Sequence, residues 1–368
     1  MRLTRRNVLL GLAFVIASAV IIAGLSLLHP RVRYVVTAAA YQLELLWGRV
    51  DLDRALATGD FTPAQRARLE QVPRIRNFAV RQGLAETGHY STISPGWNHT
   101  VYNVSACEPL RFKPRTWWFP IVGRVPYLGY FDQAQAEHKA DALRAEGLDV
   151  YVRTAGAWST LGWFNDPLLP AMADWTEARL ANVLLHELTH ATVWIPGSVA
   201  FNESLANFVG DTASLAYLRE VYGSDSPEVL QELELRADRD RFGQMMRELY
   251  KDLDDLYRSD LPDPMKEKRK KEILDSIPDR TRAAGFHNPE RWVKWVQRDP
   301  WNNARLVQFR VYNRSPEWFE AVLRQEDEDL PRFFRRIESI ARGAPDPYRA
   351  LAEAAGVDPD EKERPTEP

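Results

Sequence analysis

Cysteine is almost absent from this sequence, and neither sign of charge is in marked excess. The 368 residues include one cysteine, Cys107, which excludes an internal disulfide and a cysteine-rich zinc or iron–sulfur site. Because 48 Lys and Arg face 51 Asp and Glu, the formal charge is -3, which argues against binding to nucleic acid. The hydrophobic content of 45%, with 12 Trp, predicts a folded chain rather than disorder.

One long hydrophobic run is present near the beginning of the chain. Residues 8–28 are uncharged and mostly apolar, a length that crosses a bilayer as a helix. Three arginines precede the run and two follow it, so the positive-inside rule favours a cytoplasmic N-terminus. We therefore predict an N-terminal signal anchor over residues 1–33. Two alternatives stay open: Arg5-Arg6 resembles a twin-arginine export signal, and residues 17–19 could be a cleavage site.

The rest of the chain is predicted to be one mostly helical α+β domain over residues 34–355, followed by a disordered acidic tail over 356–368. Short segments rich in Val, Tyr, Trp and Phe predict a small sheet, and Pro and Gly predict where helices end. The expected helices are 34–57, a second one opened by Thr62-Pro63, 132–146, and almost everything from Thr176 onward, with breaks at Pro196-Gly197 and Gly223; the expected strands include 100–104, 116–122 and 150–154. The charge-rich residues 226–276 predict a solvated helical hairpin, with a docking surface as the alternative.

The chemical signal is an HExxH motif formed by His186, Glu187 and His190. The i, i+4 spacing places both imidazoles on one face of a helix, one turn apart, so both can reach one ion. Zinc accepts neutral imidazole and keeps a position for water in catalytic sites. Glu187 beside that water can take its proton. Thr176 is available as the cap of this helix, with Glu177 in its first turn.

A third protein ligand is expected on the next helix. Glu203 follows a turn at Pro196-Gly197, and we predict that Asn202 caps the helix and places Glu203 in its first turn. Asn207, one turn later, could accept a hydrogen bond from a ligand histidine. Asp211 is the rival third ligand, but eight residues separate it from Glu203, or about 12 Å along a helix. Both cannot bind the same ion.

These residues resemble the gluzincin pattern, and more narrowly the bacterial predicted-aminopeptidase family, many of whose members are envelope lipoproteins. The resemblance covers roughly residues 35–345 and includes 112–120, 123–131, 158–167, 302–304 and Tyr312. It implies a zincin-like catalytic domain with a small sheet, one zinc ion held by His186, His190 and Glu203, and hydrolysis of peptides, with Glu187 as general base. This chain has no cysteine directly after its hydrophobic run, so attachment to the inner membrane would depend on the helix alone, with the catalytic domain on the periplasmic side of the cell envelope.

Other residues are candidates for further roles in the site. Tyr312 is our candidate for stabilising the oxyanion, ahead of His287. Asp166 and Glu137 could bind a substrate amine, although a loop carboxylate before Pro167 is also typical of a turn. The segment 149–155 could form a sheet edge on which a peptide pairs, or an ordinary interior strand.

A different class of function stays open. The chain could be a membrane-tethered interaction or assembly factor in which residues 226–276 bind a partner and the zinc site is structural. Without the five arginines of residues 1–35, the body has 43 basic against 51 acidic residues, a charge of -8. Such a body has no electrostatic reason to lie on an anionic membrane.

Overall fold

The computed structural model describes residues 18, 21, 24, 30–119, 123–155, 165–312 and 316–358. Among these residues, no helix combines the length and the apolar character needed to cross a membrane. The predicted anchor, residues 8–28, lies outside the described part apart from Ser18, Ile21 and Gly24. The predicted tail lies outside it from residue 359 onward.

The N-terminal region forms short helices around one small strand pair. Its elements are α2 (Pro30–Trp47), β1 (Val50–Asp51), α3 (Leu52–Thr58), α4 (Pro63–Leu69), α5 (Val72–Arg81) and β2 (Thr92–Ile93). The expected single helix over 34–57 is wrong, because β1 pairs with β2 and the Asp51 side chain caps α3. The expected start at Thr62-Pro63 is confirmed by a capping box between Thr62 and Gln65.

A three-stranded antiparallel sheet follows, in the order β6-β3-β7. The elements of this region are β3 (Val101–Cys107), β4 (Trp117–Phe119), β5 (Gly123–Val125), β6 (Leu128–Tyr130), α6 (Gln133–Ala145) and β7 (Asp149–Ala155). β4 and β5 form a separate two-stranded pair. Alternate side chains of β3 and β7, including Val104 and Val150, pack on α6, as strand periodicity requires. The opposite face of the sheet is turned toward α13.

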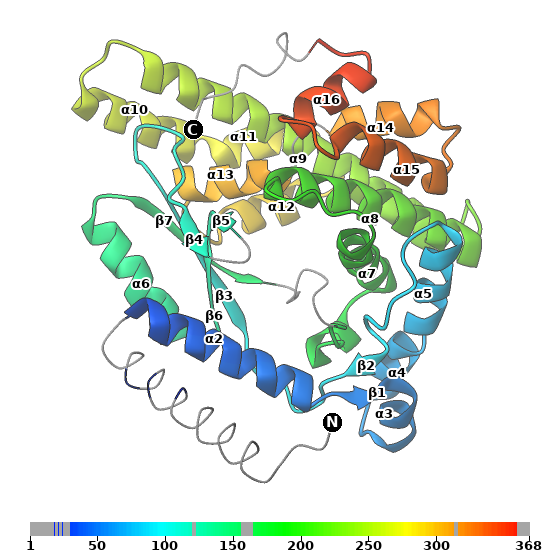
Figure 1. Cartoon of the computed structure of the whole chain (residues 1–368). Coiled ribbons are helices and arrows are strands. Elements are labelled where there is room, and N and C mark those ends of the chain that lie inside the picture. The colour runs from blue at the N-terminus through cyan, green and yellow to red at the C-terminus, as the bar shows by residue number, and fades with distance from the viewer. Residues whose placement is uncertain are drawn as a thin grey trace.

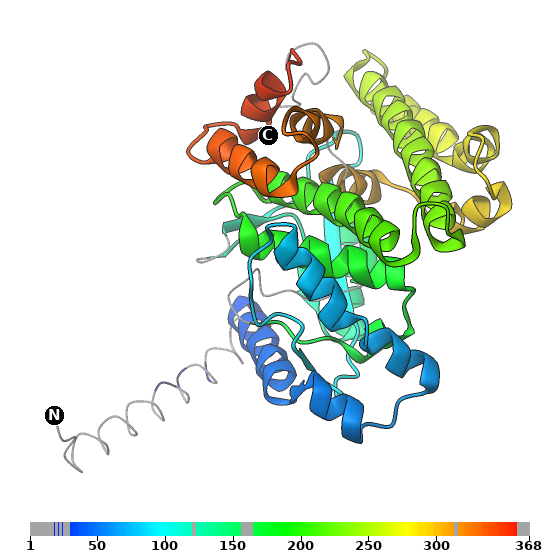
Figure 2. The ribbon, with the colours of Figure 1, turned by 90° about the vertical axis from the view of Figure 1, so that its right-hand side faces the viewer.

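The second half of the described chain is helical, as predicted from Thr176 onward. After the 3-10 helix η1 (Pro170–Asp174) come α7 (Glu177–Thr192), α8 (Val199–Tyr222), α9 (Pro227–Arg258), α10 (Asp263–Asp275), α11 (Ile277–Ala283), α12 (Pro289–Val296), α13 (Asn303–Tyr312), α14 (Pro316–Gln325), α15 (Leu330–Ala341) and α16 (Pro347–Ala354). Figure 1 places α7 between α5 and the sheet, with α8 packed beside it, while α2 lies against the sheet. In Figure 2, α9–α12 and α14–α16 lie on opposite sides of α8.

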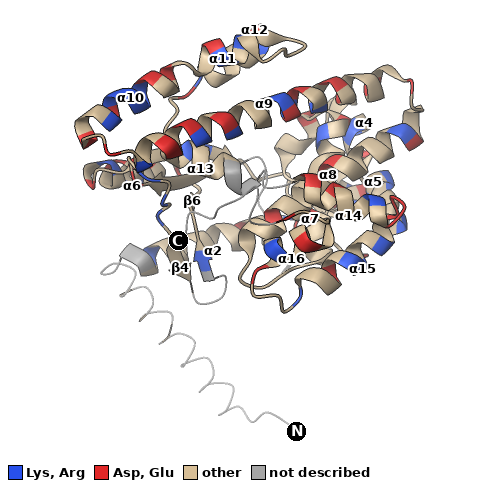
Figure 3. Ribbon diagram, turned by 90° about the horizontal axis from the view of Figure 1, so that it is seen from above, with Lys and Arg blue, Asp and Glu red and all other residues tan. Residues whose placement is uncertain are grey.

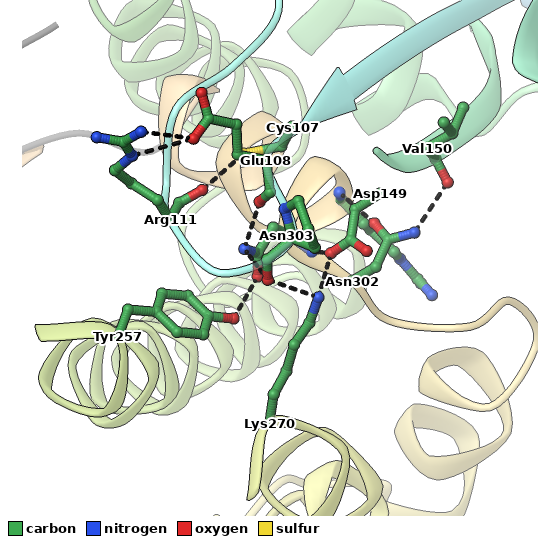
Figure 4. A network of polar contacts seen from close by, with 11 residues as sticks. Cys107, Glu108, Arg111, Asp149, Val150, Tyr257, Lys270, Asn302 and Asn303 are labelled. Carbon is green, nitrogen blue, oxygen red and sulfur yellow. Dashed lines mark hydrogen bonds and ion pairs between the residues drawn. The ribbon is translucent and has the colours of Figure 1, made fainter. Parts of the chain in front are cut away.

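The charged hairpin, formed by α9 and α10, confirms the expected helix pair, and Figure 3 shows both signs of charge along it. It is not merely solvated, because one face of α9 builds an apolar core with Phe242, Met246 and Leu249. A polar network fixes it to the sheet (Figure 4): Lys270 of α10 donates to Asp149 of β7 at 2.5 Å.

Asn303 of α13 completes this network. Its amide accepts from Tyr257 of α9 at 2.7 Å and donates to the Glu108 carbonyl at 2.9 Å. Cys107 lies beside it, and burial raises the pKa of its thiol to about 12. The thiol is therefore protonated at neutral pH. The hydrogen bonds of Lys270 and Asn303 connect the α9–α10 hairpin, α13 and the sheet to one another.

Candidate metal centre

Helix α7, which carries the HExxH motif, is fixed at its start and along one side. Thr176 caps it by accepting from the backbone N–H of Arg179 at 3.3 Å, as predicted. Glu177 in the first turn is buried and accepts from the hydroxyls of Tyr217 (2.8 Å) and Tyr222 (2.6 Å) of α8. The apolar side of α7 lies in the main core, with Leu180, Leu184 and Leu188 buried. The histidines are therefore held on a rigid element.

Helix α8 approaches α7 unusually closely at Gly210. A Cβ atom at this position would lie 2.9 Å from the carbonyl oxygen of Asn182 and 3.2 Å from Cβ of His186. Only glycine allows this approach without displacement of a backbone or of a ligand side chain. Gly210 was not predicted from the sequence, although it lies seven residues after Glu203 and hence two turns along the same face of α8.

The start of α8 differs from the expectation. The helix begins at Val199, with Ser198 as N-cap, so Asn202 is not the cap and Glu203 is not in the first turn. Asn202 has another role: its amide accepts from the Ile195 N–H and donates to the Ile195 carbonyl, both at 2.9 Å. Because Asn202 is 1% exposed, these bonds fix the turn between the two helices from inside the core.

This packing brings His186, His190 and Glu203 together. One ligand atom from each lies within 4.8 Å of the others. The Glu203 carboxylate faces both rings, with 3.6 Å to Nε2 of His186 and 3.8 Å to Nε2 of His190. Donor atoms of a tetrahedral zinc ion lie about 3.3 Å apart, given bonds of roughly 2.0–2.1 Å. The two Glu203–histidine distances lie within about 0.5 Å of this value, and the three residues could hold a single metal ion.

The protonation of the cluster depends on how each group balances burial against its neighbours. Burial and the charge of His186 lower the pKa of His190 to about 4, so this ring is neutral near pH 7 and able to bind a metal. Burial alone would lower the pKa of His186. The hydrogen bond from the facing Glu203 and the charge of Glu187 outweigh the effect of burial, so the pKa of His186 is raised. Burial would raise the pKa of Glu203, yet the two histidines and Arg153 hold it below its usual value.

The surroundings support Glu203 over Asp211 as the third ligand. The Asn207 side chain hydrogen-bonds to His186 and helps to raise its pKa, which confirms the contact expected from the sequence. Asp211 is not part of the cluster. Its carboxylate instead accepts a hydrogen bond from the Asn182 amide at 2.8 Å and lies 3.6 Å from the Arg239 guanidinium. The second ring nitrogen of His190, Nδ1, is buried and has no hydrogen-bond partner among the described residues.

The other predicted residues are placed as follows. Tyr312 ends α13, which packs on α8 and the sheet, but its side chain lies outside the described part of the chain. His287 lies between α11 and α12, and its ring hydrogen-bonds to Asp238 of α9 at 2.8 Å. Asp166 is buried, 3.7 Å from Nδ1 of His89. Glu137 is half-buried on α6 and pairs with Arg144 at 3.6 Å.

Two features near the cluster were missed from the sequence. A cavity beside Glu203 is bordered by β3, the start of α8 and α13. Tyr90 has a left-handed backbone, with φ of 59°, and its hydroxyl is buried with no hydrogen-bond partner among the described residues. Burial and the charges of Glu187 and Asp166 raise the pKa of Tyr90 well above its usual value. A strained, buried tyrosine close to the HExxH motif cannot be inferred from local sequence patterns.

These features define a mostly helical α+β protein with small sheets and a His–His–Glu cluster that could hold a metal ion. A family model described as "Putative aminopeptidase" matches residues 33–350. The chain belongs to this family, which suggests that it is a peptidase. No curated protein and no solved structure was found to match it.

Proposed function

We propose that the protein hydrolyses peptide bonds with one zinc ion, as an aminopeptidase of the gluzincin type. The observation that carries this proposal is the convergence of His186, His190 and Glu203 within 4.8 Å, with Glu187 on the same helix turn. Two imidazoles and a carboxylate form a donor set typical of catalytic zinc, which leaves room for a water molecule. Family membership supports the peptidase activity and its aminopeptidase direction.

The residues of the chain divide the work between holding and proton transfer. His186, His190 and Glu203 hold the ion, and Asn207 keeps the His186 ring oriented through its hydrogen bond. Zinc, when bound, polarises the scissile carbonyl and lowers the pKa of the attacking water. Glu187 takes the proton from that water and passes it to the leaving amine. We assign the stabilisation of the oxyanion to Tyr312, at the end of α13.

The location proposed for this activity is the cell envelope. The hydrophobic run at residues 8–28 anchors the protein in the inner membrane by a single pass, and the peptidase body acts on peptides on the periplasmic side. Protease treatment of spheroplasts tests this location: digestion of the body is expected, whereas protection until the membrane is opened would contradict it.

The activity is tested with wild-type protein and Glu187→Gln side by side. We expect both proteins to bind one zinc ion and the variant to lose about 10²-fold or more in hydrolysis of aminoacyl substrates, because only the general base is removed. Glu177→Gln, which alters a buried acid of the same helix far from the ion, is the control for folding. If both proteins bind zinc and neither cleaves any peptide, the alternative of an assembly factor with a structural zinc site is favoured.

A further inference from the structure

Helix α2 packs into the protein through an apolar face. Leu45 is 1% exposed and belongs to the main core, against which Ala38 and Tyr41 also pack. The ring of Tyr41 stacks on that of Phe131, with 4.6 Å between the centroids. Because this face is held in the core, α2 is part of the folded body, and Figure 1 shows it along the lower edge of the described part of the chain.

The opposite face of α2 is also apolar, and it is exposed. Val35, Ala39, Leu43 and Trp47 follow one another at intervals of four residues, which places them along one side of the helix. Val35 is 50% exposed, Leu43 48% and Trp47 83%, and Ala39 is exposed as well. A helix that is apolar all round is normally covered all round. These four residues, here called the outer face, therefore indicate a contact beyond the described residues.

The charged residues of α2 leave the outer face apolar. The helix contains three of them, Arg31, Arg33 and Glu44. The Glu44 carboxylate bonds to Nε2 of His99 at 2.9 Å, and the His99 ring lies edge-on to Tyr41 on the core side of the helix. The one acid of α2 is thus directed toward the body. Both arginines lie in the first turn, next to the hydrophobic run, where basic residues favour a membrane surface.

The two most exposed large hydrophobic side chains of the described residues are tryptophans, and one lies near each end of α2. Trp47 is the last residue of the helix. Trp118 of β4 is 64% exposed, and its neighbour Phe119 has its ring 5.9 Å from that of Tyr34, near the start of α2. Tryptophan is enriched where hydrocarbon meets water, because the indole combines an apolar body with one N–H donor.

The chain just before α2 indicates what covers the outer face. The hydrophobic run at residues 8–28, proposed above as the anchor, is separated from Pro30 by His29 alone. One residue spans about 3.5 Å at most, so an anchor that crosses the bilayer delivers α2 directly to the bilayer surface. The body has a charge of -8 and is not attracted by anionic lipids. A contact here must therefore be apolar.

We propose that α2 is an interfacial helix whose outer face lies on the lipid bilayer, as a second membrane contact beside the anchor. This inference rests on the proposed membrane location and does not depend on the peptidase chemistry. With two contacts, the body is held in one orientation on the membrane and does not rotate freely on a tether.

The test measures the depth of α2 with nitroxide spin labels, on full-length protein reconstituted into phosphatidylcholine vesicles. The labels are attached to Val35→Cys and to Leu43→Cys, one variant at a time. Leu230→Cys is the matched control, because Leu230 of α9 is a leucine that is 50% exposed. The native Cys107 does not compete for the label, since its thiol is buried and its pKa is raised to about 12. Depth is obtained by comparing collisions with oxygen, which concentrates in lipid, and with a water-soluble nickel chelate.

We expect the labels at Val35→Cys and Leu43→Cys to lie at nearly equal depth, about 5–10 Å into the bilayer, and the label at Leu230→Cys to lie in water. A helix that continued steeply from the anchor would separate the first two labels by about 12 Å in depth, given a rise of 1.5 Å per residue. Such a gradient would overturn the inference.

Two further results would also overturn it. One is a label at Leu43→Cys that meets the nickel chelate as often as the label at Leu230→Cys, in protein that stays in the vesicles during a carbonate wash; the anchor would then stand without the second contact. The other is strong dipolar broadening between labels at Leu43→Cys, which would assign the outer face to a second copy of the chain. Release of the protein by the carbonate wash would refute the membrane location itself.

Discussion

Zinc affinity is expected to depend on Glu203 and not on Asp211, although both acids lie on α8. Glu203 is 7% exposed and faces the two histidine rings at 3.6 and 3.8 Å. Structural zinc sites with four ligands bind with about 10–16 kcal/mol, so one ligand contributes about 3 kcal/mol, or roughly a hundredfold in Kd. Glu203→Gln should weaken zinc binding by about this factor.

Asp211→Asn is the matched control, because it makes the same chemical change eight residues along the same helix. The Asp211 side chain is 41% exposed and already engaged with Arg239 and Asn182. We expect its Kd for zinc to stay within about threefold of wild type. The assay is competition with a chromophoric zinc chelator, after circular dichroism has shown that both variants are folded. A larger Kd for zinc in Asp211→Asn than in wild type, together with an unchanged Kd in Glu203→Gln, would refute the ligand assignment.

Three further outcomes follow from the geometry around the cluster. Gly210→Val should lower the free energy of unfolding by about 1–3 kcal/mol and weaken zinc binding, because the new side chain meets the Asn182 carbonyl and His186; an unchanged melting temperature would contradict the close approach. Asn202→Ala should cost about 2 kcal/mol in urea unfolding, since two buried bonds to Ile195 are lost, and a cost near zero would disprove this role. Because the pKa of His186 is raised, a proton competes with zinc for this ring as the pH falls. Calorimetry of zinc binding in several buffers should therefore detect release of about one proton below that pKa and little release above it. Proton release that does not vary with pH would contradict the assignment of His186 as a ligand.

Local chemistry made several elements predictable. The Thr176 cap, the break at Gly223 and the spacing of His186 and His190 are signals that act within a few residues, and the structure has them where expected. The HExxH spacing also fixed which side chains could share an ion, because a helix places residues i and i+4 on one face.

Features that depend on distant contacts were not predictable in this way. Asn202 resembles a cap locally, but its amide bonds to Ile195 in the preceding turn, and α8 begins four residues earlier than expected, with Ser198 as its cap. The contact between Arg153 and Gln308 joins a strand to a helix more than a hundred residues away. Helical spacing across residues 34–57 concealed the break before Val50, which is set by pairing with Ile93 of β2.

The most direct test of the metal centre is X-ray diffraction from zinc-loaded crystals, recorded on both sides of the zinc absorption edge. It shows whether a metal ion binds between His186, His190 and Glu203. We predict one anomalous peak at about 2.0–2.2 Å from Nε2 of His186, Nε2 of His190 and a carboxylate oxygen of Glu203. No peak at this position, or a peak at Asp211 instead, would contradict the account.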